Sequence, residues 1–228
     1  MYARRVQGKV LDFGHRGWLY EESFLFYDRQ TDSLWVQATG EAVHGAYKGT
    51  RLDRLPATQT TWGKWVQLHP DTQVLGRYST VDFWRDSYSD YYETGKGVKY
   101  QRNAPLHFGL AVILPGKQKL YPFRELEKTP VLLDHIGGEP IVVVFHSRSR
   151  TAVAFDPRVQ NRSLEFELET TNKDDVILKD KQTASTWSGL TGRCLTGPDK
   201  GTQLRQLTTT QFVVENWRLH YPEGQIYP

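Results

Sequence analysis

Sulfur-containing residues are scarce in this sequence. Cys194 is the only cysteine and Met1 the only methionine among 228 residues. One cysteine cannot form an internal disulfide, and it cannot supply the several thiolates of a structural zinc site. A disulfide-stapled fold and a thiolate-rich zinc site are therefore excluded, whereas the cellular compartment stays open.

Long apolar runs are missing as well. No stretch approaches the roughly 20 consecutive apolar residues that span a bilayer. The first residues, Met1–Arg5, also lack the apolar core of a secretory signal. We therefore expect no membrane span and no signal peptide within these residues.

Charge of one sign does not dominate. The net charge is +3, and Lys and Arg are mixed with Asp and Glu along the chain. A protein that binds nucleic acid concentrates basic residues on one face, because each phosphate contact depends on them. The one local excess of basic residues, at positions 148–162, is read as a solvated edge. The pattern disfavours a nucleic-acid partner.

Recognisable catalytic motifs are absent. The chain has no Gly-x-Ser-x-Gly elbow and no phosphate-binding loop. Cys194 takes the place of Ala42 in the repeat described below, which favours a small core residue over a reactive thiol. No catalytic residue and no cofactor follow from motifs, so both stay unassigned.

Aromatic residues, in contrast, are abundant: seven Trp, twelve Tyr and ten Phe. Flat and β-branched side chains fit the pleated, half-buried surface of a sheet. This composition predicts a mainly β protein.

One motif occurs twice, at roughly residues 5–75 and 158–227. Arg5 recurs 153 positions later as Arg158, and after one deletion the offset becomes 152 and holds. The pairs at the second offset include Asp28 and Asp180, Arg29 and Lys181, Trp35 and Trp187, and Trp65 and Trp217. Agreement at a constant offset indicates an internal repeat.

We interpret these repeated residues as structural. An aspartate closes a turn by bonding to nearby backbone groups, a cation follows it, and a tryptophan packs beneath. Trp65 and Trp217 are expected to anchor short helices on the sheets. Thr61 is a suitable N-cap for the first of these helices, which should end before Pro70.

The section between the copies, residues 76–157, combines an aromatic excursion with a set of strands. Apolar runs predict strands at 108–114, 117–121, 131–133, 141–145 and 152–155. The expected fold is mainly β, with two pseudo-equivalent strand-rich repeats (1–75 and 158–228) and a few short helices. All are expected to form one compact domain over 1–228.

The second copy is preceded by these strands, whereas only Met1–Arg4 precede the first. Either the strands at 108–156 serve both copies, or the first copy lacks a segment, which is the reading we favour. A missing segment leaves a sheet edge exposed, and such an edge pairs readily with another chain. We therefore expect a homo-oligomer or a partner chain that completes the first repeat.

Several short segments resemble a prokaryotic family, that of domain of unknown function 3179. In the repeats the segments are Tyr27-Asp28-Arg29-Gln30-Thr31, Gly49-Thr50-Arg51-Leu52, Thr61-Trp62 and His69-Pro70-Asp71-Thr72. In the middle they are Tyr121-Pro122, Gly137-Gly138-Glu139-Pro140 and Thr151-Ala152-Val153-Ala154-Phe155. The resemblance covers almost the whole chain.

The resemblance carries no activity over to this chain. It implies an exported or periplasmic location as one option, because similar proteins are often exported. Such proteins often show a Cys-Pro-Leu-Cys-like stretch before the first copy. The corresponding strand end before the second copy here is His146-Ser147-Arg148-Ser149, without a cysteine. A thiol-based role for that stretch is therefore in doubt in this chain.

Two groups of residues are candidates for a site. His107, Asp134, His135 and His146 are expected at strand ends and could hold a metal, although hydrogen-bonded polar residues at strand ends are the commoner case. An aromatic segment at 78–100 sets rings beside carboxylates, as in sugar recognition, although such a loop also packs on its own side chains. Its candidate ligand contacts are Tyr78, Trp84, Asp86, Tyr88, Asp90, Tyr91 and Tyr92.

The leading hypothesis is a non-catalytic binding or interaction module, with a glycan or another polymer as a candidate ligand of the aromatic segment. A metal-assisted enzyme that uses the histidine and aspartate group is the first alternative. A structural subunit completed by another chain is the second. The sequence does not separate the three.

Overall fold

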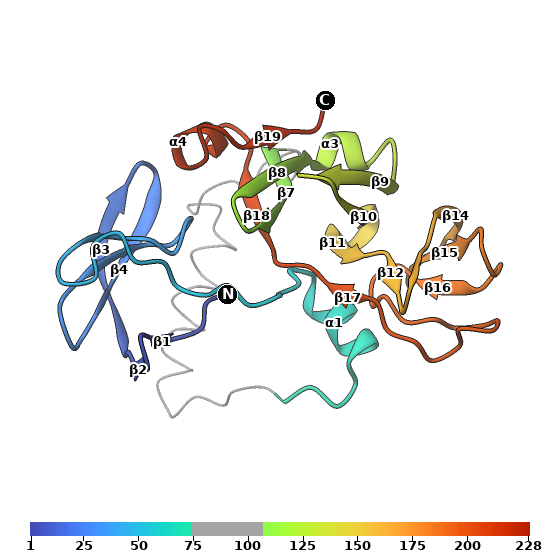
Figure 1. Ribbon diagram of the computed structural model, residues 1–228, viewed down its shortest axis with the longest axis horizontal. Coiled ribbons are helices and arrows are strands. Elements are labelled where there is room, and N and C mark those ends of the chain that lie inside the picture. The colour runs from blue at the N-terminus through green and yellow to red at the C-terminus, as the bar shows by residue number, and fades with distance from the viewer. Residues whose placement is uncertain (74–106) are drawn as a thin grey trace, which may run out of the picture.

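The computed structural model describes residues 1–73 and 107–228. Two strand-rich lobes lie at opposite ends, and two further sheets lie between them (Figure 1). The helices in the described ranges are all short, so the prediction of a mainly β fold is confirmed. No helix in those ranges is long and apolar enough to cross a membrane.

The first lobe contains a two-stranded ribbon and a four-stranded antiparallel sheet. The ribbon pairs β1 (Arg5–Val6) with β2 (Lys9–Val10). The sheet has the order β3 (Phe13–Tyr20), β4 (Ser23–Asp28), β5 (Leu34–Val36) and β6 (Ala42–His44). In residues 51–55 only Arg51 and Arg54 make isolated bridges, to Glu41 and Tyr2. The chain then reaches α1 (Trp62–Leu68), which Thr61 caps as predicted.

The second lobe repeats this plan. Its ribbon pairs β12 (Arg158–Val159) with β13 (Arg162–Ser163). Its sheet has the order β14 (Phe166–Thr171), β15 (Val176–Asp180) and β16 (Thr186–Ser188). The first strand of each sheet, β3 or β14, is an edge strand.

Two four-stranded sheets form the centre. The first has the order β18 (Thr209–Val213), β7 (Phe108–Leu114), β8 (Lys117–Pro122) and β19 (Gln225–Ile226). The second has the order β17 (Arg205–Gln206), β11 (Thr151–Asp156), β10 (Glu139–His146) and β9 (Val131–Ile136). Three short helical segments complete the chain: α3 (Phe123–Leu126), the 3₁₀ turn η2 (Ser147–Ser149) and α4 (Trp217–His220).

Strand β10 is buried on both faces, which suits its continuous run of valines. Ile141 and Val143 face the core between the two central sheets. Val142 and Val144 face the second lobe and pack with the core that surrounds Trp187. The strand therefore joins the central sheets to the second lobe through apolar contacts on both sides.

A buried aspartate closes the same turn in each lobe. In the second lobe the carboxylate of Asp180 accepts hydrogen bonds from the backbone N–H and the hydroxyl of Thr183, at 2.6 and 2.9 Å, and from Trp187 Nε1 at 2.9 Å. In the first lobe Asp28, Thr31 and Trp35 make the same three bonds at 2.6, 2.9 and 3.0 Å. The two copies therefore share this side-chain network as well as their sequence.

The hydrogen bonds also set the ionisation of Asp180. Burial by itself would raise the pKa of this carboxyl, but the bonds from Trp187 and Thr183 outweigh burial and lower the pKa below its usual range. A charged carboxylate is therefore the form that the turn requires.

Replacing this carboxylate should destabilise the lobe. Asp180→Ala leaves the indole N–H of Trp187 and the hydroxyl of Thr183 without their acceptor in a buried place, so we expect a loss of about 2–4 kcal/mol in the free energy of unfolding. Urea denaturation measures it. The exposed Asp12→Ala is the control and should cost less than about 1 kcal/mol. Equal effects of the two substitutions would refute the structural role of Asp180.

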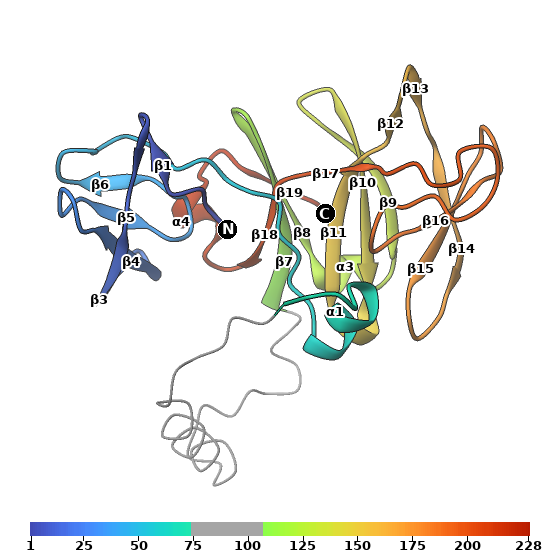
Figure 2. The same cartoon turned by 90° about the horizontal axis from the view of Figure 1, so that it is seen from below.

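The helix that follows each lobe packs beside the opposite lobe. Helix α1 follows the first lobe and lies against the β14–β15 loop of the second, where Lys64 donates hydrogen bonds to the carbonyl oxygens of Lys173 and Asp174. Helix α4 follows the second lobe and lies beside the first (Figure 2). Tyr221, just after this helix, accepts a hydrogen bond of 2.6 Å from Arg54 of the first lobe. Each half of the chain therefore contacts the other through the helix that follows its lobe.

The anchor tryptophans differ in burial. Trp217 is fully buried with Phe212 and Leu120 against the central sheet. Trp65 is only half-buried and donates its indole N–H to Thr72 at 2.8 Å. Helix α4 is therefore docked by its tryptophan, whereas α1 is docked by Lys64.

Asp156 holds the end of β11 to β17. Its side chain is 7% exposed and accepts bonds from Arg158 Nε at 2.8 Å and from Arg205 Nη2 at 2.7 Å. Burial by itself would raise the pKa of Asp156, but the bonds from Arg158 and Arg205 outweigh burial and lower it to about 2.

The depressed pKa predicts a pH-dependent contribution to stability. An unfolded aspartate titrates near pH 3.9 and the folded Asp156 near pH 2, so the stabilisation is complete above about pH 4 and is lost as the pH falls toward 2. The lost free energy is on the order of 2 kcal/mol. Asp156→Asn should flatten the stability profile between about pH 4 and 2 in urea unfolding. A profile parallel to that of the wild type in this window would contradict the assignment.

Candidate functional site

A cavity of about 240 Å³ lies where the first half of the chain meets the second. We call it the junction pocket. Helix α1 contributes Lys64 and Gln67, η2 contributes Arg148 and Ser149, and the loop between β14 and β15 contributes Lys173 and Asp174. The pocket exists only because α1 docks on the second lobe.

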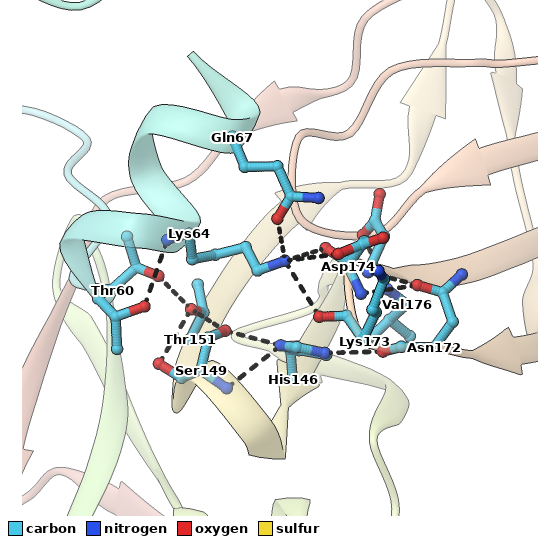
Figure 3. A network of polar contacts seen from close by, with 12 residues as sticks. Thr60, Lys64, Gln67, His146, Ser149, Thr151, Asn172, Lys173, Asp174 and Val176 are labelled. Carbon is cyan, nitrogen blue, oxygen red and sulfur yellow. Dashed lines mark hydrogen bonds and ion pairs between the residues drawn. The ribbon is translucent and has the colours of Figure 1, made fainter. Parts of the chain in front are cut away.

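Lys64 carries a buried ammonium group. The residue is 7% exposed, and its Nζ donates to Gln67 Oε1 at 2.7 Å, to the carbonyl oxygen of Asp174 at 2.7 Å and to that of Lys173 at 3.2 Å. Figure 3 shows these bonds converging on the nitrogen. The three protons of the ammonium are used, which is how a buried lysine remains tolerable.

The nearest carboxylate to Lys64 is that of Asp174, at 3.7 Å. A hydrogen bond from Gln67, together with the charges of Lys173 and Lys64, holds the pKa of Asp174 below its usual range. The pocket wall therefore carries one anionic group beside three cationic side chains, those of Lys64, Arg148 and Lys173.

A chain of hydrogen bonds runs behind the pocket and ends at His146, which is buried. His146 Nε2 lies 3.0 Å from the carbonyl oxygen of Asn172, which can only accept, so in the neutral ring Nε2 holds the proton and Nδ1 accepts. Ser149 Oγ, at 2.7 Å, donates to Nδ1. Thr151 Oγ1 then donates to Ser149 Oγ at 2.7 Å, and Thr60 Oγ1 donates to Thr151 at 2.6 Å (Figure 3).

The direction of these hydrogen bonds follows from the carbonyl oxygen of Asn172, which can only accept. Ser149 Oγ and Thr151 Oγ1 each accept one bond and pass one on, and the Thr151 hydroxyl also lies 3.4 Å from the carbonyl oxygen of Ser149. Among the described residues no buried side-chain nitrogen or oxygen lacks a hydrogen-bond partner. The chain joins Thr60 of the first half to the core of the second.

The contact between Thr60 and Thr151 is expected to couple the two halves. Thr60→Val and Thr151→Val should each lower the free energy of unfolding by about 1–2 kcal/mol. In a double-mutant cycle followed by urea unfolding, the coupling energy should be about 0.5–1.5 kcal/mol. Thr186→Val with Thr196→Val, an exposed pair 2.6 Å apart within the second lobe, is the control and should couple more weakly. Purely additive effects of the Thr60 and Thr151 substitutions would count against the docking.

The histidine and aspartate group does not converge. His107 pairs with Glu215 at 2.9 Å on the surface, and Asp134 accepts bonds from Lys119 at 2.6 Å and from Tyr121 at 2.8 Å. His135 is exposed, and His146 is buried in the chain described above. In the ranges 1–73 and 107–228, no three His, Cys, Asp or Glu side chains form a group that could hold a metal ion.

The environment of Asp134 explains its role. Burial would raise the pKa of Asp134, but hydrogen bonds from Lys119, the backbone of His135 and Tyr121 outweigh it and lower the pKa. Burial and the bond to Asp134 raise the pKa of Tyr121 in turn. Asp134 lies in β9 and its partners Lys119 and Tyr121 lie in β8, so these hydrogen bonds hold the two strands together.

The aromatic segment lies outside the described residues. Its seven candidate contacts, Tyr78, Trp84, Asp86, Tyr88, Asp90, Tyr91 and Tyr92, belong to residues 74–106. A sugar-binding role for them stays a prediction from composition. Cys194, in contrast, is described: it is buried in the core of the second lobe, where burial raises the pKa of its thiol.

A second candidate surface lies on the sheet of the first lobe. In the second lobe Phe166, Val176 and Leu178 are at most 3% exposed, because the valines of β10 and β11 pack against them. The equivalent residues of the first lobe, Phe13, Phe24 and Phe26, are only half-buried. Phe13 and Phe26 pack against the Trp35 core of their own lobe, and Phe24 stacks on His15. In the described ranges no hairpin takes the place that β10 and β11 occupy on the second lobe, so we call these residues the three-phenylalanine face.

The edge of the same sheet is also apolar. Trp18, Leu19 and Tyr20 at the end of β3 are 51%, 66% and 42% exposed. In the second lobe the corresponding edge strand β14 carries Glu167 and Glu169 and contacts β9. Charged residues and a covering strand are the usual protections of a sheet edge. The edge of β3 carries Arg16, which forms an ion pair with Asp32, but within the described ranges no strand pairs with its outer side.

No local sequence pattern marks Lys64, Thr60 or Ser149 as site residues. The partners of Thr60 and Lys64 lie about 90 residues or more away, and those of Ser149 flank the turn η2. The phenylalanine face did leave a signal, since Phe24 and Phe26 stand where the second copy has Val176 and Leu178. Large apolar side chains that are less buried than their counterparts indicate an interaction surface.

The fold and these two sites define a two-lobed, mainly β protein whose halves share one plan and exchange their helices. The chain belongs to the family described as Protein of unknown function (DUF3179). The family model matches it twice, over residues 1–108 and 100–227, once for each half. No curated protein and no solved structure matches the chain.

Proposed function

We propose that this chain is a non-catalytic interaction module whose first lobe binds an apolar β-hairpin of a partner polypeptide. The observation that carries the proposal is the difference between the lobes. The same sheet face is covered by β10 and β11 in the second lobe and is left half-exposed, with three phenylalanines, in the first.

The covering strands of the second lobe indicate what the partner supplies. Strands β10 and β11 form a hairpin, residues 139–156, whose outward side chains on one face are Val142, Val144 and Val153. A hairpin with an apolar face would bury the exposed part of the phenylalanine rings. Full burial of a ring from water contributes about 1.5–3 kcal/mol, and these half-buried rings would gain about half of that each. The unpaired edge of β3 can add backbone hydrogen bonds to such a strand.

One residue predicts a difference between the two interfaces. Gly189 of the second lobe lies so close to β10 that a Cβ there would come within 2.8 Å of Val144 Cγ1. The first lobe has Gln37 at this position, and it is exposed. The partner strand should therefore carry a residue smaller than valine opposite Gln37.

A synthetic peptide tests the proposal directly. The probe is residues 139–156 of this chain with Val144→Ala, labelled and extended by lysines for solubility. We expect saturable binding to the wild-type chain in fluorescence anisotropy. Phe24→Asp should weaken binding at least about ten-fold, because it places a charge in the apolar contact.

Leu168→Asp is the control, since Leu168 is an exposed apolar residue, 43%, on the edge strand of the second lobe. It should leave binding unchanged. The proposal fails if the peptide does not bind, or if both aspartate variants bind it equally. Light scattering distinguishes a further case. If the wild-type chain is a dimer and Phe24→Asp makes it a monomer, a second copy of the chain occupies the phenylalanine face, and the proposal of a different partner polypeptide is wrong.

A further inference from the structure

The junction pocket is unusual in its charge. Its walls bring together the cations Lys64, Arg148 and Lys173 and the single carboxylate of Asp174. Lys64 is the fixed member, because its ammonium is held by Gln67 and by two backbone carbonyl oxygens. Carbonyl dipoles orient the ammonium without cancelling its charge.

The other two cations remain available to a ligand. Arg148 and Lys173 are exposed, and neither side chain makes a hydrogen bond or an ion pair within residues 1–73 and 107–228. A guanidinium presents two parallel N–H groups that match the oxygens of a carboxylate or a phosphate. Arg148 sits on the turn η2, whose position is fixed by the hydrogen bond between His146 and Ser149.

The opposite junction provides an internal comparison. Helix α4 meets the first lobe at a second cavity, of about 210 Å³, in the corresponding place. Its lining has Asn216 at the position of Lys64 and Glu22 at that of Asp174, and in the sequence Glu21 takes the place of Lys173. The excess of cationic side chains is therefore found at only one of the two junctions, so the shared fold of the halves does not by itself produce it.

We propose that the junction pocket binds an oxyanion, a carboxylate or phosphate group of a ligand, between Arg148 and Lys173 and in the field of Lys64. The three cations outnumber the one carboxylate, so the pocket has a net positive charge that an anion would balance. A volume of about 240 Å³ accommodates such a group together with several waters. This inference concerns a different surface from the phenylalanine face and is independent of it.

The experiment uses the full chain with inorganic phosphate and with acetate, each titrated by calorimetry at constant ionic strength with chloride as the balancing ion. We expect saturable binding of one or both oxyanions. Arg148→Gln should weaken it about ten-fold, the effect of losing a charge-assisted hydrogen-bond pair. Lys173→Gln should weaken it as well.

Arg193→Gln is the matched control, because Arg193 is an exposed arginine on the second lobe, away from the pocket. It should bind as the wild type does. Preference for phosphate over acetate, or the reverse, assigns the group on the ligand. The proposal is overturned if neither anion binds saturably, or if Arg148→Gln and Arg193→Gln bind equally well.

Discussion

The sheet of each lobe buries one face, and its core holds a fully buried tryptophan, Trp35 or Trp187. The second lobe cannot complete this core with its own residues. The valines of β10 and β11 complete it, and the same two strands also face the central core with their other side. The arrangement of the central sheets, and with it the position of every other element, depends on this two-sided burial.

The exchange of helices has a similar cause. A helix of four or seven residues has little stability alone, so it forms where tertiary contacts hold it. Trp217 provides such contacts for α4 through burial, and Lys64 provides them for α1 through hydrogen bonds to the opposite lobe. Because α1 is held by the ammonium group of Lys64, its contact with the second lobe stays polar and open to water, and the junction pocket lies there.

The two halves keep the same turn and differ at their boundaries. Asp28 and Asp180 make matching hydrogen bonds, because the turn must hold its tryptophan in both lobes. The residues that meet other elements have changed: phenylalanines replace smaller residues on the first lobe, and a lysine replaces an asparagine at one junction. Differences between the two similar halves therefore mark the surfaces where each half meets a different environment.

Local patterns in the sequence determined the strands, the repeat and the helix cap at Thr61, since alternation, turn residues and capping act over a few neighbouring positions. They also determined that β10 is central, because its valines are continuous. Only the tertiary structure decided that α1 crosses to the other lobe, that Thr60 meets Thr151 and that Lys64 is buried. These contacts join residues about 90 or more positions apart, and their energy depends on how whole sheets pack, which no local pattern records.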